Sequence, residues 1–340
     1  MNKITTIGLD LAKNVFHVVC CDEHGKVVGK KMLKRSKVLE YFANLPRCLV
    51  GMEACASAHH WARELEALGH EVKLIPPQHV KPYLRGNKND YNDALAIAEA
   101  VMRPQMRFVE IKTEAQQDIQ ALHRLRERRV QERTALCNQL RGLLAEYGLV
   151  LPKGISAVRG RIPALLEDAE NGLSDFFRRL LAQSYQQLLE LDAHIDVYGE
   201  ELKRYSAQND ACQRLQTIPG FGPVVASAFV SHVATGESYR RGRDVSASIG
   251  LVPRQHSSGG KQVLLGISKR GDRYLRCLMI QGARAVVYRA DKKDDPLSRW
   301  IKRIMDRRGV NRAIVALANK MARIGWAILR NKTIYQAAQA

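Results

Sequence analysis

The first hundred residues alternate between short apolar runs and amphipathic segments. Five apolar runs predict strands, at residues 4–10, 15–21, 26–33, 48–52 and 71–75. The turn sequence EHGK at residues 23–26 predicts a hairpin connection among the early strands. Ser36 is expected to cap one helix, Gly69 to end a second, and Asp90 to begin a third. This order predicts an α/β sheet with helices on its faces.

The middle of the chain is polar but carries leucines and other apolar residues at helical spacing. Residues 113–148 and 174–205 are low in glycine and proline, so they predict two long helices. We expect a helical hairpin that acts as a coiled-coil-like spacer. Such a spacer serves either as a rigid linker or as a surface for subunit assembly, and we favour assembly.

The last third changes character again. From Leu215, the segment LQTIPGFGPVVASAFVSHV predicts two helices joined by a glycine-rich turn. This resembles a helix–hairpin–helix element that holds a phosphate, although an ordinary turn between helices is the alternative. Trp300 and Trp326 follow helical spacing and are expected in the core. We predict three domains: an α/β domain at residues 1–110, a helical spacer at 111–206 and a mainly α domain at 207–340.

Charge gives the first indication of a partner. The 340 residues hold 54 lysines and arginines against 34 acidic residues, a formal net charge of +20. From Ala207 to Ala340 there are 24 basic and 8 acidic residues, so this third carries +16 of the total. A strong positive excess favours a polyanionic partner, and nucleic acid is the commonest one. We therefore expect nucleic acid mainly on the C-terminal third, with acidic chemistry housed earlier in the chain.

Two further patterns bear on location. No stretch reaches the roughly 18 apolar residues of a membrane span, and the N-terminus runs directly into a strand pattern. The seven cysteines form no CxxC pair, which argues against a zinc site or a secreted disulfide framework. We expect a cytoplasmic protein without membrane contact and with reduced cysteines.

Four carboxylates stand where an α/β sheet forms sites. Asp10 and Glu53 end predicted strands, and Asp90 and Asp93 share one face at the start of a helix. Converging carboxylates repel one another unless they share a cation, and hard oxygen ligands select Mg²⁺ or Mn²⁺. A lone acid at a strand end is commonplace, however, and Asp90 alone could be a helix N-cap.

These carboxylates and a C-terminal segment carry a family resemblance. GLDLAKNVF around Asp10 and NDYNDALAIAEA around Asp93 resemble the DEDD transposases of insertion-sequence family 110. SIGLVPRQHSSGGKQVLLGISKRGDRYLR at residues 248–276 resembles that family's serine-bearing domain, and its end is closest to subgroup 1111. The resemblance implies a ribonuclease-H-like (RuvC-like) N-terminal domain, an order that the strand pattern also favours.

The resemblance also implies a mechanism. Ser258, directly before the first glycine of SSGG, would attack a DNA phosphodiester and form a transient phosphoserine, in a composite site with Mg²⁺ held by the four carboxylates. Donor and target DNA would be chosen by a guide RNA of the bridge type, and the protein would assemble as dimers that pair into a tetramer. From the residues alone, the Ser258 segment reads as an ordinary Ser/Gly loop. Several basic and polar residues are expected at nucleic acid: Lys13, Arg254, His256, Lys261, Lys269, Arg270, Arg273 and Arg276.

Three other interpretations fit the sequence. A hydrolytic ribonuclease-H-like nuclease, such as a Holliday-junction resolvase, would use water as the nucleophile and would stay active without Ser258. A non-enzymatic nucleic-acid scaffold would not need the carboxylates. A degenerate transposase is the third, and the intact set of four carboxylates and Ser258 argues against it.

Overall fold

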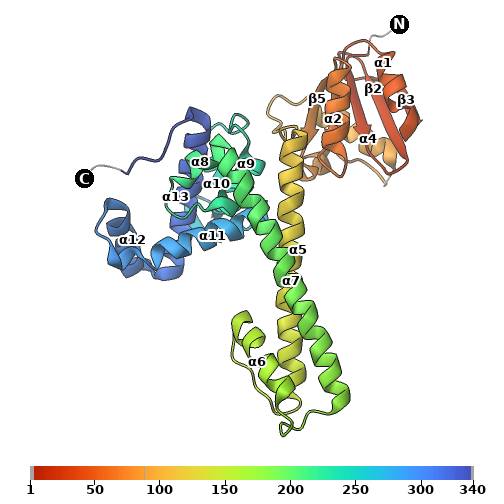
Figure 1. Cartoon of the computed structure of the whole chain (residues 1–340). Helices are drawn as coiled ribbons and strands as arrows, with labels where there is room; N and C mark the ends of the chain where they lie inside the picture. The colour runs from red at the N-terminus through yellow and green to blue at the C-terminus, as the bar shows by residue number, and fades with distance from the viewer. Residues whose placement is uncertain (1–3, 88, 338–340) are drawn as a thin grey trace. The chain divides into compact units, whose positions relative to one another are not determined.

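The computed structural model describes residues 4–87 and 89–337, which divide into two compact units. The first unit is Met1–Glu114 and the second is Ala115–Ala340. Figure 1 shows a sheet with helices in the first unit and helices almost throughout the second. The predicted boundary between a spacer and a basic domain, near residue 206, falls inside the second unit and stays a prediction.

The first unit is built on a mixed five-stranded sheet in the order β3-β2-β1-β4-β5. Its strands are β1 (Thr6–Asp10), β2 (Val15–Cys21), β3 (Val27–Lys34), β4 (Leu49–Glu53) and β5 (Glu71–Ile75). The first three strands are antiparallel neighbours, whereas β1, β4 and β5 run parallel. All five strands lie where the apolar runs predict them.

Helices cover both faces of this sheet. They are α1 (Val38–Ala43), α2 (Ala58–Ala67), α3 (Pro77–Val80) and α4 (Asp90–Val101), with short 3₁₀ turns at Arg35–Lys37 and Lys81–Tyr83. Ile7 and Leu9 of β1 pack with α1 and α2, so the alternate residue Gly8 faces the other side. There a Cβ on Gly8 would lie 1.9 Å from the Ala94 carbonyl oxygen of α4. Gly8 therefore lets α4 press directly against β1.

The Ser36 prediction is wrong in detail. Ser36 lies inside the 3₁₀ turn, and the N-cap of α1 is Lys37, which makes no side-chain cap hydrogen bond. The expected end of α2 at Gly69 is confirmed, since Gly69 follows the C-cap Leu68 with φ +91°.

The second unit begins with a long helical arm. It contains α5 (Glu114–Ala145), α6 (Ile155–Glu167) and α7 (Asp175–Gln208). Figure 1 shows α5 and α7 side by side with α6 against their far end, and apolar residues such as Leu140 and Leu188 form a shared core. Asp192 of α7 links the three helices of the arm, because its carboxylate pairs with Arg133 of α5 at 2.7 Å and with Arg159 of α6 at 3.2 Å. The two predicted long helices are thus present.

The rest of the second unit is a helical bundle with one protruding hairpin. Its helices are α8 (Asp210–Gln216), α9 (Pro223–Val233), α10 (Gly242–Ser248), α11 (Arg273–Val287), α12 (Pro296–Arg308) and α13 (Val310–Asn331), with a 3₁₀ turn at Ala290–Lys292. They enclose one apolar core centred on residues such as Phe229 and Met279. The predicted glycine-rich turn joins α8 and α9. Gly220 in that turn has φ +93° and lies against the Gly282 carbonyl of α11, so only glycine fits.

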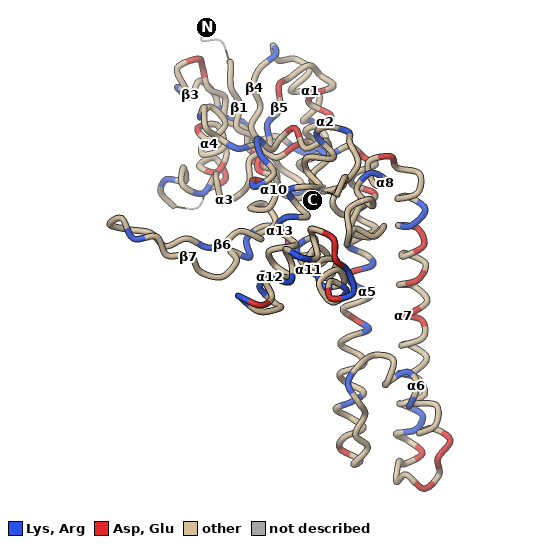
Figure 2. The backbone as a smooth tube through the Cα atoms, turned by 90° about the vertical axis from the view of Figure 1, so that its left-hand side faces the viewer, with Lys and Arg blue, Asp and Glu red and all other residues tan. Residues whose placement is uncertain are grey.

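The segment around Ser258 is a β-hairpin, and the expectation of an irregular loop is wrong. Strands β6 (Pro253–Ser258) and β7 (Lys261–Ile267) pair across the two-residue turn Gly259–Gly260. Both glycines have positive φ, +55° and +78°, as a two-residue turn of the type I′ family requires. A Gly-Gly pair between two short runs was the sequence signal for this hairpin. Figure 2 shows the hairpin extending away from the helices of its own unit.

None of the helices within residues 4–87 and 89–337 combines the length and the apolar character needed to cross a membrane.

Candidate carboxylate centre and serine hairpin

The first candidate site lies at one edge of the sheet. Asp10 is the last residue of β1 and Glu53 the last residue of β4. Because these neighbouring strands are parallel, their carboxyl ends meet at the same edge. The close packing of α4 on Gly8 brings the first turn of that helix to this edge, with Asp90 and Asp93 in it.

Three of the four predicted carboxylates converge closely. Asp10, Asp90 and Asp93 each offer an oxygen, and these oxygens all lie within 4.8 Å of one another. Glu53 lies outside that trio, but it is near enough for the charge of Asp93 to raise its pKa, after the larger effect of burial. The alternative role for Asp90 as an N-cap is excluded, since Asn89 caps α4 by accepting from the Tyr91 amide.

The carboxylates of this cluster repel one another, and too little positive charge lies nearby to offset the repulsion. Burial, followed by the charges of Asp93, Asp90 and Glu53, raises the pKa of Asp10 from 3.8 to about 6. The charge of His17, which faces Asp10 across the β1–β2 pairing, counteracts this rise in the pKa of Asp10. Its Nδ1 lies 3.5 Å from the Asp90 carboxylate. An all-oxygen cluster that resists ionisation fits a hard divalent cation, which would relieve the repulsion.

The second candidate site is the hairpin, where Ser258 ends β6 and pairs with Lys261 across the turn. Every residue of β6 is exposed. Ser257 accepts a hydrogen bond from the Gln255 amide at 2.9 Å. Among the contacts of the described residues, Ser258 has no such side-chain hydrogen bond, so its hydroxyl is presented to solvent. Arg254, His256 and Lys261 are exposed beside it.

The base of the hairpin is tightly built. A Cβ on Gly271 would lie 1.7 Å from the Ser248 carbonyl, and one on Gly250 would lie 2.3 Å from the Arg270 carbonyl. The two segments that flank the hairpin therefore cross at glycines, which explains why the GLVP and SKRGD motifs each contain one.

Arg276 belongs to this packing. It is 7% exposed, and its guanidinium donates to the carbonyls of Ile249 at 2.9 Å and Arg270 at 3.2 Å. Its predicted contact with nucleic acid does not agree with this burial, so we assign it to holding the crossing segments. Lys13, Lys269, Arg270 and Arg273 are exposed, as a contact with nucleic acid requires.

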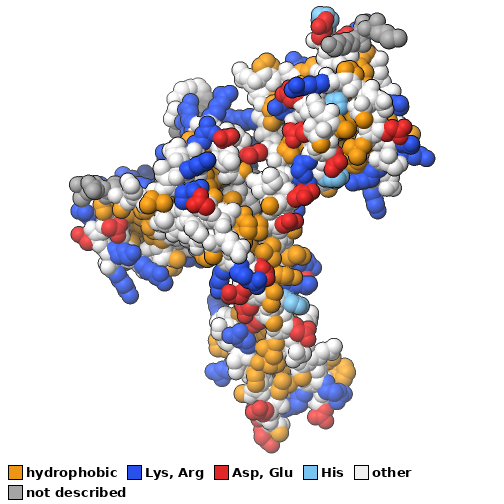
Figure 3. Space-filling model, turned by 45° about the horizontal axis from the view of Figure 1, so that its top comes forward, with side chains coloured by type: hydrophobic (Ala, Val, Ile, Leu, Met, Phe, Trp, Pro, Cys, Tyr) orange, Lys and Arg blue, Asp and Glu red, His pale blue; other side chains and the backbone are white. Residues whose placement is uncertain are grey.

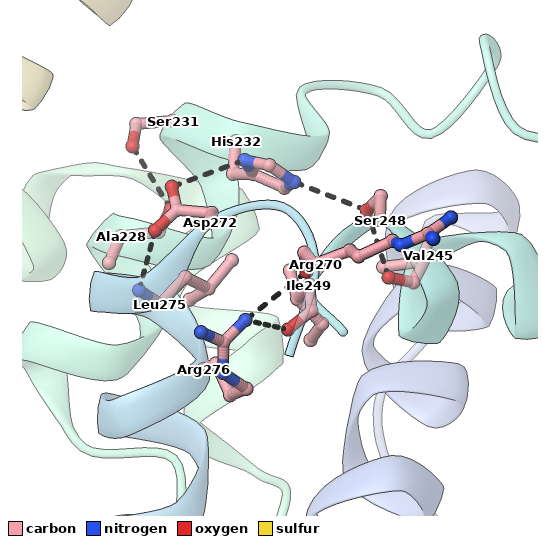
Figure 4. A network of polar contacts seen from close by, with 10 residues as sticks. All are labelled: Ala228, Ser231, His232, Val245, Ser248, Ile249, Arg270, Asp272, Leu275 and Arg276. Atoms are coloured by element: carbon pink, nitrogen blue, oxygen red, sulfur yellow. Dashed lines mark hydrogen bonds and ion pairs between the residues drawn. The ribbon is translucent and has the colours of Figure 1, made fainter. Parts of the chain in front are cut away.

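Sequence reasoning missed a polar chain at the same place (Figure 4). His232 of α9 lies between Ser248, with 3.3 Å from Nε2 to Oγ, and Asp272, with 3.5 Å from Nδ1 to the carboxylate. Ser248 is the last residue of α10 and Asp272 the N-cap of α11, so His232 joins both segments that enter the hairpin. The three residues are far apart in sequence and no local pattern links them. Only the fold reveals the set.

Asp272 is held as a carboxylate by its partners. Burial raises its pKa, but the hydrogen bond from His232 and that from the Leu275 amide outweigh burial and lower the pKa from 3.8 to about 2. His232 donates a hydrogen bond from Nδ1 to the Asp272 carboxylate, its Nε2 lies beside the Ser248 hydroxyl, and that hydroxyl donates to the Val245 carbonyl at 2.9 Å. This chain fixes the base from which Ser258 projects.

Comparison with known proteins decides the family. A family model for DEDD transposases of the IS110 type, described as "Transposase", matches residues 7–149. A second model, "Transposase IS116/IS110/IS902 family", matches residues 212–298. The chain is 48% identical over 336 residues to the transposase for insertion sequence element IS1111A of Coxiella burnetii, with 99% of this chain and 92% of that relative covered.

The chain belongs to the IS110 transposase family.

Two further relatives agree. A probable family 20 transposase of Pseudomonas aeruginosa is 47% identical, with 98% of this chain and 99% of the relative covered. The transposase for insertion sequence element IS1328 of Yersinia enterocolitica is 42% identical, again with 98% and 99% covered. The transposase is therefore a protein of an insertion sequence, and DNA is its substrate. The resemblance found in the sequence is confirmed. The roles of single residues in this transposase are not decided by the comparisons and are argued below.

Proposed function

We propose that this transposase cleaves and rejoins DNA strands through a phosphoserine intermediate on Ser258, assisted by a divalent metal held at Asp10, Asp90 and Asp93. The observation that carries the proposal is the convergence of those carboxylates at the end of β1. The strand order β3-β2-β1-β4-β5, with three antiparallel strands followed by two parallel ones, supports a ribonuclease-H-like N-terminal domain.

The residues of the carboxylate cluster divide the work. Asp10, Asp90 and Asp93 would bind the metal directly, and Glu53, at the end of the adjacent strand, would complete the set. Mg²⁺ or Mn²⁺, when bound, supplies charge stabilisation for the phosphate oxygens in phosphoryl transfer. His17, beside Asp90, would orient that carboxylate toward the shared position.

The serine step balances without a co-reactant. The Ser258 hydroxyl oxygen forms a bond to phosphorus, the bond from phosphorus to the 3′ oxygen breaks, and the hydroxyl proton ends on that 3′ oxygen. Attack by a 3′-hydroxyl of another strand reverses the step, joins the new strand and frees Ser258. Because the phosphoserine keeps the bond energy, no nucleotide cofactor is consumed.

The surroundings of Ser258 suit a phosphate. Lys261 and Arg254 are exposed on the same hairpin, and Lys269, Arg270 and Arg273 lie just beyond it. We propose that these cations, with His256, contact phosphates of the substrate strands, and that Lys13 does so next to the carboxylates. Positive charges near a transferring phosphoryl group stabilise its transition state.

We further propose that a bridge-type guide RNA selects donor and target DNA by base pairing. A +20 chain offers ample charge for a second nucleic acid. Base pairing would then supply the specificity, and the protein would read backbone and shape.

The arm supports our proposal of dimers that pair into a tetramer. Large apolar side chains are exposed along it, and Figure 3 shows orange side chains gathered on one of its faces. The exposed large apolar residues of the arm include Leu125, Tyr147, Val150, Phe176 and Val197, and Val150 is 83% exposed. Exposed apolar side chains on paired helices are typical of subunit interfaces.

The rival function is a hydrolytic nuclease, and a nicking assay separates the two. Supercoiled donor DNA is incubated with the protein, its co-purifying RNA and Mg²⁺, and the products are run on a denaturing gel. We expect cleavage that EDTA and Asp10→Ala abolish, with protein attached to DNA in the wild type and absent in Ser258→Ala. Ser257→Ala is the matched control and should keep the adduct. Cleavage that persists in Ser258→Ala without any adduct would establish hydrolysis instead.

A further inference from the structure

A pocket of about 530 Å³ opens among α10, α12 and α13. One of its lining residues, Asn319, donates its side-chain amide to the Leu251 carbonyl at 3.1 Å, in the segment that leads into the serine hairpin. Its lining residues include the aromatic residues Trp300 and Trp326 and the basic residues Lys320 and Arg323. The two tryptophans were expected in the core. They do pack against the core as partly buried residues, but each also lines this open pocket.

Both indole rings are held in place. Trp326 donates its ring N–H to the Gly236 carbonyl at 2.9 Å. Trp300 has the Lys320 ammonium 4.7 Å from its ring centroid, a cation–π distance. A Cβ on Gly236 would lie 3.1 Å from Trp326, so the glycine permits the close approach. Rings that are already fixed lose little freedom when a flat ligand stacks on them.

The positive charge of the residues around the pocket favours an anionic ligand. No carboxylate is among the described residues that line it. Residues 296–331, which include α12 and α13, hold nine lysines and arginines against the single acid Asp306. Aromatic rings beside cations form the combination that binds unpaired nucleotides, in which bases stack and phosphates pair with positive charge. The volume lies within the range of roughly 300–1,000 Å³ usual for small-ligand sites.

We propose that this pocket binds one unpaired nucleotide of a nucleic-acid strand, with the base against Trp300 and Trp326 and the phosphate at Lys320 and Arg323. A base inside a duplex is stacked on both sides and cannot enter. The inference rests on the proposed function, because strand exchange is the activity that leaves nucleotides unpaired. It adds a site that holds one nucleotide of the displaced or guide strand.

The native tryptophans make the site measurable in the full-length protein. The chain has three tryptophans, and the third, Trp61, lies in the core of the first unit. A Trp61→Phe background leaves the two pocket tryptophans as reporters. It is titrated with a thymidine 15-mer, a uridine 15-mer and a 15-base-pair duplex. We expect saturable quenching by a single strand, and the tighter of the DNA and RNA arms identifies the source. Quenching no stronger with either single strand than with duplex would overturn the proposal.

Variants distinguish binding in the pocket from non-specific electrostatic binding of nucleic acid to the basic surface. Lys320→Gln with Arg323→Gln should weaken single-strand binding by about tenfold or more. Ala327→Leu fills the pocket without removing charge and should weaken single-strand binding while leaving duplex binding unchanged; Ala327 is one of the lining residues. Arg284→Gln is the matched control, an exposed arginine on α11 outside the lining, and should change affinity less than about twofold. Circular dichroism checks that each variant is folded.

The outcomes distinguish this inference from the proposed function. Wild-type affinity in Ala327→Leu, or an Arg284→Gln effect equal to that of the double variant, refutes the pocket. If the pocket fails while the Ser258 adduct still forms on donor DNA, the proposed function stands alone. If the adduct fails while pocket-dependent quenching remains, the nucleotide site stands and the strand-exchange reaction is wrong.

Discussion

Replacing Asp10 by Asn should stabilise the metal-free protein at neutral pH. Asp10 ionises among Asp93, Asp90 and Glu53 in a partly buried position, and its pKa is raised to about 6. A carboxyl group whose pKa is raised on folding stabilises the fold while it is protonated, below its unfolded pKa of 3.8. That contribution is lost as the pH rises through about 6. Asn keeps the shape of the protonated form and has no charge to lose.

The expected size follows from the pKa difference. A rise from 3.8 to about 6 corresponds to about 3 kcal/mol at most, at about 1.4 kcal/mol for each pKa unit. The group stands at the open rim of the sheet, so solvent screening reduces this to about 1–2 kcal/mol. For a domain of this size, such a gain raises the unfolding temperature by several degrees, on the order of 4–8 °C for each kcal/mol.

Differential scanning calorimetry with EDTA measures the effect. At pH 7.5, the transition of the first unit should move to higher temperature in Asp10→Asn, and the difference should vanish toward pH 4. Adding Mg²⁺ should stabilise the wild type and leave Asp10→Asn nearly unmoved. Glu23→Gln is the control, since Glu23 is a 77% exposed acid of the same unit outside the cluster. A lower unfolding temperature for Asp10→Asn at pH 7.5 in EDTA would refute the reasoning, because it would mean that the charge of Asp10 is stabilised rather than opposed.

Three other predictions concern the second unit. Gly271→Ala should destabilise the second unit by about 1–3 kcal/mol in urea titrations, because φ is +77° and a Cβ would collide with the Ser248 carbonyl. Gly259→Asn, in the open turn of the hairpin, is the control and should lower the free energy of unfolding far less. Equal losses in the two variants would contradict the close crossing of the segments that flank the hairpin. Asp272→Asn should lower the unfolding temperature at neutral pH. Its lowered pKa gives stability above pH 3.8 that is lost toward pH 2, so the difference should close on acidification. A pH-independent difference would mean that the hydrogen bonds from His232 and the Leu275 amide do not favour the ionised carboxylate. Phe176→Asp on the arm should shift sedimentation velocity toward smaller species, and an unchanged distribution would place the interface elsewhere.

The sheet and its carboxylates could be predicted because their signals are local. Five apolar runs of strand length lie between clear turns, and parallel strands deliver Asp10 and Glu53 to one edge by geometry alone. The i, i+3 spacing of Asp90 and Asp93 fixes their common face. The sequence could not supply the distances between the four carboxylates. The contact of α4 with Gly8 sets how close Asp90 and Asp93 come to Asp10, and Glu53 stays outside this closest trio.

The features that were missed depend on tertiary contacts. Ser36 matches the residue preference of an N-cap, but the chain tightens into a 3₁₀ turn there and α1 starts later. His232 has no sequence signal, because its partners lie 16 and 40 residues away and meet only through helix packing. Strand β6 is polar, and the apolar residues Val263, Leu264 and Leu265 of β7 are consecutive rather than alternating. The Gly-Gly turn was therefore the clearest sequence signal for the hairpin.

The most direct test of the central claim is to identify the amino acid that carries DNA. Reactions with donor DNA and Mg²⁺ are quenched in denaturant, digested with nuclease and trypsin, and analysed by tandem mass spectrometry for nucleotide-modified peptides. We predict a nucleotide joined through phosphate to Ser258, in the peptide that spans residues 255–261, and no such peptide with Asp10→Ala. A nucleotide on another residue, or efficient cleavage with no modified peptide, would contradict the serine mechanism.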